Sequence, residues 1–321
     1  MYSSLVRWRV PLVLATLTVF PLVMPYEALA INILVFGLYA VGFNLLFGYT
    51  GLLSFGHAAF FGIGGYATGI AMLEFGIPWP LALAAGVATA VLLGVVMGCL
   101  AIRTRGIYFS MVTLALGQIV YYTVYKADRW TGGENGLRGI SVPSVTLFGW
   151  HLDFLNPLTK YYVILVFVGL ALWFVSRLLN SPFGAVMEAV RENETRAAAC
   201  GFSVAKTKVL VFVLSAGICG LAGGLRALHL SIVPIDSLHY LQSGQAVMMC
   251  LLGGMGTFFG PFVGAGIYLF LEDAVTNLTA HWMGVVGIIF MICVIFFPKG
   301  VWGSALAWID ARRAMSHRTS P

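Results

Sequence analysis

Charged residues are scarce in this sequence. Only 9% of its 321 residues are Asp, Glu, Lys or Arg, whereas 60% belong to the apolar set. In a water-soluble domain roughly a quarter of the residues are charged, because charged side chains keep its surface hydrated. The scarcity of charge therefore excludes a soluble globular protein.

Motifs of nucleotide binding and catalysis are also absent. The chain lacks the G-x-x-x-x-G-K-[ST] loop that holds nucleotide phosphates, and it lacks the H-E-x-x-H and G-x-S-x-G patterns. Its five cysteines are scattered without a C-x-x-C pair, which argues against a disulfide framework and a metal site. We therefore expect no catalytic residue, cofactor or metal in this chain.

Long apolar runs, in contrast, recur along the whole chain. A helix of about 20 apolar residues crosses the ~30 Å of hydrocarbon in a bilayer. Only helices and closed barrels satisfy their backbone polar groups in lipid, and a barrel shows ~10-residue segments of alternating polarity instead. The sequence therefore predicts an all-α, polytopic membrane bundle of about ten spans. We place the spans near residues 10–26, 28–49, 52–73, 79–101, 107–125, 160–179, 208–229, 241–258, 261–279 and 282–298.

Basic residues concentrate on one side of these spans. With the N-terminus in the cytoplasm, 13 of the 18 Lys and Arg residues fall in cytoplasmic segments. Such an asymmetry identifies the loops that stay inside, so we expect both termini in the cytoplasm. The net charge of +6 then reflects orientation in a membrane, and we expect no binding of nucleic acid.

The first 30 residues leave two alternatives open. Arg7 and Arg9, the apolar stretch 10–24 and the Ala-Leu-Ala triplet at 28–30 resemble a signal peptide with its cleavage site. Cleavage would still leave Ile31 outside, so every later loop keeps its side of the membrane.

A single permease domain is expected over residues 1–303, followed by a basic cytoplasmic tail over 304–321. The domain includes an extracytoplasmic loop over 126–159 and a cytoplasmic insert over 181–208, which is the most charged stretch of the chain. The insert is either a solvated connecting loop or an ordered helical element with a function of its own.

The insert carries the signals of a helix. Ser181 suits the N-cap, Pro182 suits the first helical position, and Gly201 suits a left-handed stop. Its apolar residues recur at helical spacing: Phe183, Val186 and Val190. The sequence therefore predicts an amphipathic helix with one apolar side and one charged side.

Six sequence blocks in order resemble one family of transporters. They are GLLSFGHAAFFGIGGY at 51–66, RGIYFSMVTL at 105–114, TGGENGL at 131–137, RENE at 191–194 with Gly201, GGMGTFFGPFVGA at 253–265, and PKG at 298–300. From about residue 34 to residue 303 the chain resembles the LivM-type permeases of branched-chain amino acid ABC importers, together with the related urea and amide permeases.

The resemblance implies a permease subunit that moves branched-chain or related hydrophobic amino acids inward by alternating access. It implies a bacterial inner-membrane location, with ATP and Mg bound by two partner ATPase subunits. It also implies a second permease subunit, in a heterodimer or a homodimer, and a periplasmic or extracellular substrate-binding protein. In that family the insert docks on the ATPases, so the resemblance assigns coupling to Glu188, Arg191, Glu192, Asn193, Glu194, Ala198 and Gly201.

Two alternatives to an amino-acid importer stay open at this point. A urea or short-chain amide permease would share the same sequence blocks. An ion-coupled secondary transporter or a channel would need intramembrane carboxylates, for which Glu272 and Asp273 are the candidates. Together with Arg226, these residues either carry a function or lie near the outer membrane surface and reach out to it.

Glycine-rich segments predict irregular helices. Gly56-x-x-x-Phe60-Phe61-Gly62 and Gly254-x-x-x-Phe258-Phe259-Gly260 have identical spacing, which suggests an internal repeat. The interruption between Gly253 and Pro261 suggests a broken or re-entrant helix, which is tolerated only inside protein or along a cavity. The glycines expected to pack helices closely are Gly62, Gly65, Gly69, Gly220, Gly224, Gly254, Gly256, Gly260 and Gly264.

Polar side chains inside apolar spans are the candidates for a translocation pathway, because lipid would penalise them. These candidates are Asn44, Ser54, His57, Thr113, Gln118, Gln245 and Thr257.

Overall fold

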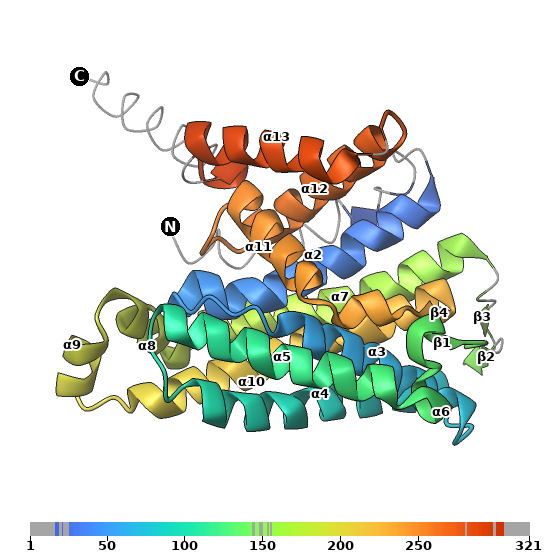
Figure 1. The fold of residues 1–321 in the computed structure, drawn as a ribbon, viewed down its shortest axis with the longest axis horizontal. Helices are drawn as coiled ribbons and strands as arrows, with labels where there is room; N and C mark the ends of the chain where they lie inside the picture. The colour runs from blue at the N-terminus through green and yellow to red at the C-terminus, as the bar shows by residue number, and fades with distance from the viewer. Residues whose placement is uncertain are drawn as a thin grey trace.

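The structure is a computed structural model that describes residues 17–18, 21, 26–142, 145–147, 150–152, 154, 156–279, 281–297 and 300–304. Within these ranges the chain is an almost entirely helical bundle (Figure 1). Most of the predicted first span, 10–26, and the predicted tail beyond residue 304 lie outside the described residues.

Among the described residues, six segments are long and apolar enough to cross a membrane. They are α2 (Glu27–Thr50), α4 (Trp79–Ala101), α5 (Ile107–Lys126), α7 (Pro157–Leu179), α10 (Val204–Leu230) and the stretch Trp282–Ser304, which begins with α13 (Trp282–Phe296). The predicted helical membrane bundle is confirmed, whereas the count of ten spans is not. Three further apolar helices are shorter: α3 (His57–Leu73), α11 (Tyr240–Gly253) and α12 (Gly260–Thr276).

Helix α2 forms the centre of the bundle. In its most apolar stretch 94% of the residues are buried, as expected of a helix that is apolar on all sides. It packs against α7 and α10 on one side and against α11 and α12 on the other (Figure 1). The shorter helices are therefore held against protein.

Helices α3 and α10 touch through their backbones. A Cβ atom on Gly64 would lie 2.2 Å from the Gly220 carbonyl oxygen, and one on Gly223 would lie 1.7 Å from the Phe61 carbonyl oxygen. Such a contact leaves no room for any side chain. The structure also places the predicted packing glycines Gly62, Gly65, Gly69, Gly220, Gly224, Gly260 and Gly264 against neighbouring elements.

Small strands lie at one end of the bundle. Strand β1 (Leu137–Arg138) pairs antiparallel with β4 (Ile232–Val233), and β2 (Val145–Leu147) pairs with β3 (Trp150–Leu152). The short helices α6 (Asp128–Thr131), η2 (Gly133–Asn135) and η3 (Ile235–Leu238) accompany them. The predicted loop 126–159 therefore contains short strands that were not predicted from its sequence.

The first break in a helix comes at residues 51–56. Helix α2 ends at Gly51, whose φ of +73° is left-handed, and α3 begins only at His57. The predicted start of this span at residue 52 is therefore five residues too early. The His57 ring lies 5.0 Å from the ring of Phe43, which precedes the end of α2 by about 10 Å of helix. Residues 51–56 thus run back alongside α2 into the bundle.

The second break comes at residues 254–259. Helix α11 has 14 residues and ends at Gly253, and α12 begins at Gly260 with Pro261 in its first turn. The interruption predicted between Gly253 and Pro261 is present, so the span placed at 241–258 is a short helix followed by irregular chain. At 1.5 Å per residue α11 is about 21 Å long, too short for a bilayer.

The two breaks do not follow the register of the predicted repeat. Gly56 precedes α3, whereas Gly254 follows α11, so Phe60 lies inside its helix while its predicted equivalent, Phe258, precedes α12. Aligning the breaks instead pairs Gly51 with Gly254, an offset of 203 residues in place of 198. The repeat itself stays a prediction.

We expect Gly223→Ala to destabilise the fold, because its Cβ would collide with the Phe61 carbonyl and separate α3 from α10. Overpacking of this kind costs about 1–3 kcal/mol. Gly266→Ala on α12, where nothing lies within 4 Å of the added atom, is the matched control. Thermal unfolding of the purified chain in detergent measures both, and an unchanged Tm for Gly223→Ala would contradict the backbone contact.

Candidate functional site

The insert over residues 181–208 is helical and projects from one end of the bundle. It consists of α8 (Pro182–Glu192) and α9 (Glu194–Ala199), at the opposite end from the small strands (Figure 1). Ser181 occupies the N-cap and Pro182 the first position, and Gly201 has a left-handed φ of +89°, as predicted. The Ser181 hydroxyl donates to the Leu178 carbonyl rather than capping the helix.

The insert is two helices where its sequence predicted one. Asn193 is extended, with φ −160°, and its Oδ1 accepts a hydrogen bond of 2.9 Å from the Arg196 amide. Asn193 is therefore the N-cap of α9, and the acidic Glu194 follows in its first turn. Asparagine followed by an acid is a helix-start signal that the sequence offered.

The predicted two-sided character of the insert is present. Met187, Val190 and Ala197 are buried against the bundle, with Gly184 close to the Leu179 backbone. The coupling candidates on the opposite side are exposed, apart from Glu194: Glu188, Arg191, Glu192, Asn193, Ala198 and Gly201. Phe202 follows them and is 45% exposed. The sequence reasoning missed Phe202, although an apolar residue directly after a helix stop in a charged segment is a visible signal.

An ion pair fixes the insert to α10. The Lys208 Nζ lies 2.5 Å from the Glu194 Oε1. The lysine side chain is only 6% exposed and lies near the N-terminus of α10, where both burial and the helix dipole disfavour a cation. Glu194 supplies the compensating charge, so this coupling candidate is engaged within the chain.

Side chains of α5 hold the first break. The Thr113 hydroxyl accepts from the Phe55 amide at 3.2 Å, and the Ser110 hydroxyl donates to the Leu53 carbonyl at 2.7 Å. Within the break, Ser54 Oγ accepts from the Gly56 amide at 3.3 Å. Two pathway candidates, Ser54 and Thr113, thus satisfy irregular backbone.

Asn44 of α2 holds the second break with both ends of its amide. Its Nδ2 donates to the Thr257 carbonyl at 3.0 Å, and its Oδ1 accepts from the Gly256 amide at 3.1 Å. The Thr257 hydroxyl accepts from the Gly260 amide at 3.1 Å, at the start of α12. Because Asn44 is 2% exposed, this clamp is shielded from solvent.

His57 lies at the start of α3 and is fully buried. Its Nε2 is 2.8 Å from Ser215 Oγ on α10, and that hydroxyl donates to the Gly42 carbonyl of α2. Ser215 therefore accepts from the imidazole, which assigns the proton to Nε2. The histidine joins three helices at the level of the first break.

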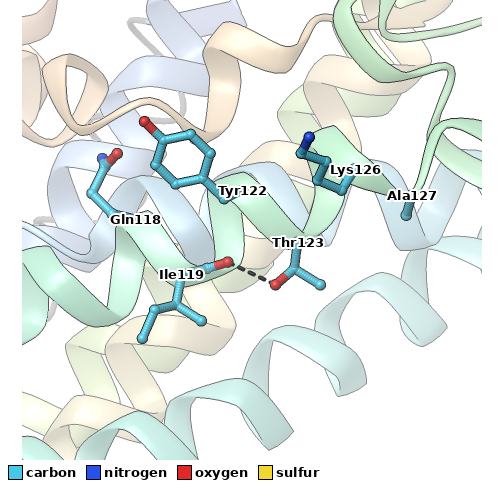
Figure 2. Close-up of a pocket in the computed structure, with 6 residues that line it drawn as sticks. All are labelled: Gln118, Ile119, Tyr122, Thr123, Lys126 and Ala127. Carbon is cyan, nitrogen blue, oxygen red and sulfur yellow. Dashed lines mark hydrogen bonds between the residues drawn. The ribbon is translucent and has the colours of Figure 1, made fainter.

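The two glutamine candidates differ in their surroundings. Gln245 Oε1 accepts a hydrogen bond of 2.7 Å from Gln242 within α11. Gln118 lies on the exposed side of α5, in an open hollow of about 680 Å³ lined also by Ile119, Tyr122, Thr123, Lys126 and Ala127 (Figure 2).

The charged residues within apolar runs lie near helix ends. Arg226 precedes the end of α10 by four residues, and its guanidinium carbon lies 4.7 Å from the Phe36 ring centroid and 5.7 Å from that of Phe61. The Tyr26 hydroxyl donates to Asp273 on α12, which raises the pKa of Tyr26 to about 12. Asp273 is thus engaged at the start of α2.

The comparisons with known proteins agree with one another. The family described as the permease component of the branched-chain amino acid transport system matches residues 26–295. The high-affinity branched-chain amino acid transport permease LivM of Salmonella typhimurium is 29% identical over 285 residues, and that of Escherichia coli is 28% identical over 284. Each match covers 81% of this chain and 66% of the relative. LivH of Escherichia coli is 24% identical over 284 residues, which is 84% of this chain and 91% of LivH. No solved structure matches the chain.

Membrane-length helices, two internal breaks and a charged helical insert fit the fold of a helical membrane permease. With its match over residues 26–295, the chain belongs to the family of branched-chain amino acid transport permeases. The resemblance inferred from the six sequence blocks is thereby confirmed. The chain spans just under two thirds of the length of the two bacterial LivM relatives.

We expect Glu194→Gln to destabilise the chain by about 1–3 kcal/mol, because it leaves the buried Lys208 ammonium without an anion. Replacing both partners, as Glu194→Gln with Lys208→Met, should restore most of the loss. Glu192→Gln changes an exposed neighbour and serves as control. Thermal unfolding in detergent measures these three variants and Lys208→Met alone, and simple additivity of the two single changes would show that the residues are not coupled.

Proposed function

We propose that this chain is the transmembrane permease subunit of an ATP-binding cassette importer that moves branched-chain or related hydrophobic amino acids inward. The observation that carries the proposal is the family match over residues 26–295. Both this family and the similar LivM proteins are named for branched-chain amino acid transport. These names favour amino acids over urea or amides. Alternating access of the helical bundle would be the transport step.

The energy for transport comes from partner subunits in this proposal. The sequence contains no phosphate-binding loop of the G-x-x-x-x-G-K-[ST] type, so ATP and Mg would be bound by two ATPases. The exposed side of the insert, with Glu188 and Glu192 beside Phe202, offers them charge and one apolar contact. An ion-coupled mechanism would need free carboxylates, whereas Asp273 is engaged by Tyr26 and Glu272 interacts electrostatically with Arg226.

A second permease subunit completes the pathway. Helix α5 is only 22% buried in its apolar stretch, yet its exposed side carries Tyr108, Gln118, Tyr122 and Lys126. Polar groups on a membrane helix face protein or a water-filled cavity. Because the chain is similar to both LivM and LivH, a heterodimer of related permeases is favoured, and its other permease would cover this side of α5.

The remaining pathway candidates have a supporting role in the proposal. Asn44, Ser54, Thr113 and Thr257 hold the two breaks, and His57 joins α3 to α10. Gln118 is then the candidate whose side chain is available to a passing amino acid, since Gln245 is bonded to Gln242. A separate binding protein outside the membrane would supply the affinity.

The proposed orientation places the insert and both termini in the cytoplasm of a bacterial cell, with the chain in the inner membrane. Its support is the distribution of basic residues along the sequence. The loop 126–159 would then face the binding protein.

Reconstitution of the whole transporter tests the function. We expect this chain, purified with its ATPases, second permease and binding protein, to take up radiolabelled leucine into proteoliposomes only when ATP is present. Omission of the binding protein is the control. Leucine uptake driven by a proton or sodium gradient without ATP would contradict the proposal.

Charge reversal on the insert tests the docking surface. We expect Glu192→Lys to lower ATP-dependent uptake about tenfold or more, because it reverses an exposed charge where the ATPases would dock. Glu74→Lys is the matched control, since Glu74 is exposed in the turn between α3 and α4, outside both the insert and the loop 126–159. Immunoblots of membranes verify insertion of both variants. Normal uptake with Glu192→Lys would argue against this surface.

A further inference from the structure

Arg191 points back toward the permease, although it belongs to the exposed side of the insert. Its Cγ lies 3.6 Å from the position that a Cβ on Gly51 would take. Its Nη1 lies 2.8 Å from the corresponding position on Gly256. The side chain therefore extends from the end of α2, at the first break, to the second break.

The backbone of both breaks leaves room for this side chain. Gly51 and Gly256 each have a φ of +73°, a conformation that favours glycine. A Cβ on Gly256 would meet the Arg191 guanidinium on one side and the Gly48 carbonyl oxygen, at 3.2 Å, on the other. Arginine and glycine thus fit each other at this point.

The Arg191 guanidinium lies beside the C-terminal end of α2. The C-terminal end of α2 carries partial negative charge on its last carbonyls, and a cation is stabilised there. Among the described residues the ion pair within 4.0 Å is Lys208 with Glu194, so Arg191 has no carboxylate partner there. Its charge is directed at the ends of broken helices.

We propose that Arg191 is a positioning residue that links the insert to both helix breaks. This inference rests on the proposed function and differs from a docking role, in which Arg191 would contact the ATPase. The ion pair between Glu194 and Lys208 fixes α9 to α10. A movement of α8 and α9 would therefore draw the Arg191 guanidinium away from residues 254–259. The second break would then lose its contact with the insert while Asn44 still holds it from α2.

The test separates docking from transmission in the assembled transporter. We expect Arg191→Ala to keep co-purification with the ATPases and ATP hydrolysis near the wild-type rate, while ATP-dependent leucine uptake falls about tenfold. Arg191→Lys keeps the charge and should recover part of the uptake. Arg103→Ala removes an exposed arginine outside the insert, in the turn that follows α4, and is the control that should transport normally.

A second variant addresses the contact from the other side. Gly256→Ala should displace the guanidinium and lower the leucine transported per ATP hydrolysed, and Arg191→Ala added to it should lower that ratio no further. An additive double variant, normal uptake by Arg191→Ala, or loss of ATPase co-purification with Arg191→Ala would each overturn the inference and leave the proposed function intact. Absence of ATP-driven uptake in the wild-type transporter would remove the proposed function and this inference together.

Discussion

Backbone amides and carbonyls of residues 51–56 and 254–259 have to find hydrogen bonds inside the protein, because neither a helix ladder nor lipid supplies them. The polar side chains of the bundle meet this requirement. Asn44 serves the second break from α2, and Thr113 serves the first from α5. The rest of the architecture follows, since α2 must be central and buried to reach the second break, and α5 must pack beside the first.

Short helices become possible once the breaks are satisfied. Helices α3 and α12 both begin directly after a break, and α3 is held against α10 by glycines so close that no side chain fits between them. A bundle made only of full-length spans would need no such contacts. The glycine-rich sequence and the polar residues in apolar runs are therefore two consequences of the same constraint.

Three features could be predicted because each depends on residues close together in the sequence. The apolar runs indicate the helical class, the segment from Gly253 to Pro261 indicates the second break, and Ser181, Pro182 and Gly201 indicate the ends of the insert. The extent of the first break could not be predicted: a turn is expected between the spans 28–49 and 52–73, but the Leu and Phe residues of 51–56 continue the apolar pattern of the next span. Asn44 lies 213 residues from Thr257, so their pairing is a product of the fold. From the sequence, Lys208 is only one of several cytoplasmic loop charges. Its burial and its ion pair with Glu194 are visible only in the structure.

Two physical routes lead from the insert to the centre of the bundle. One runs through the buried Lys208 into α10, whose glycines contact the backbone of α3 just beyond the first break. The other runs through Arg191 to Gly51 and Gly256. Because close-packed backbones shift as units and do not deform continuously, a displacement of α8 and α9 has to move α10 or release the arginine. Movement of α10 and release of Arg191 both act on residues 51–56 and 254–259, where the helices are interrupted. At these segments the conformation of the bundle can change with the loss of the fewest helix hydrogen bonds.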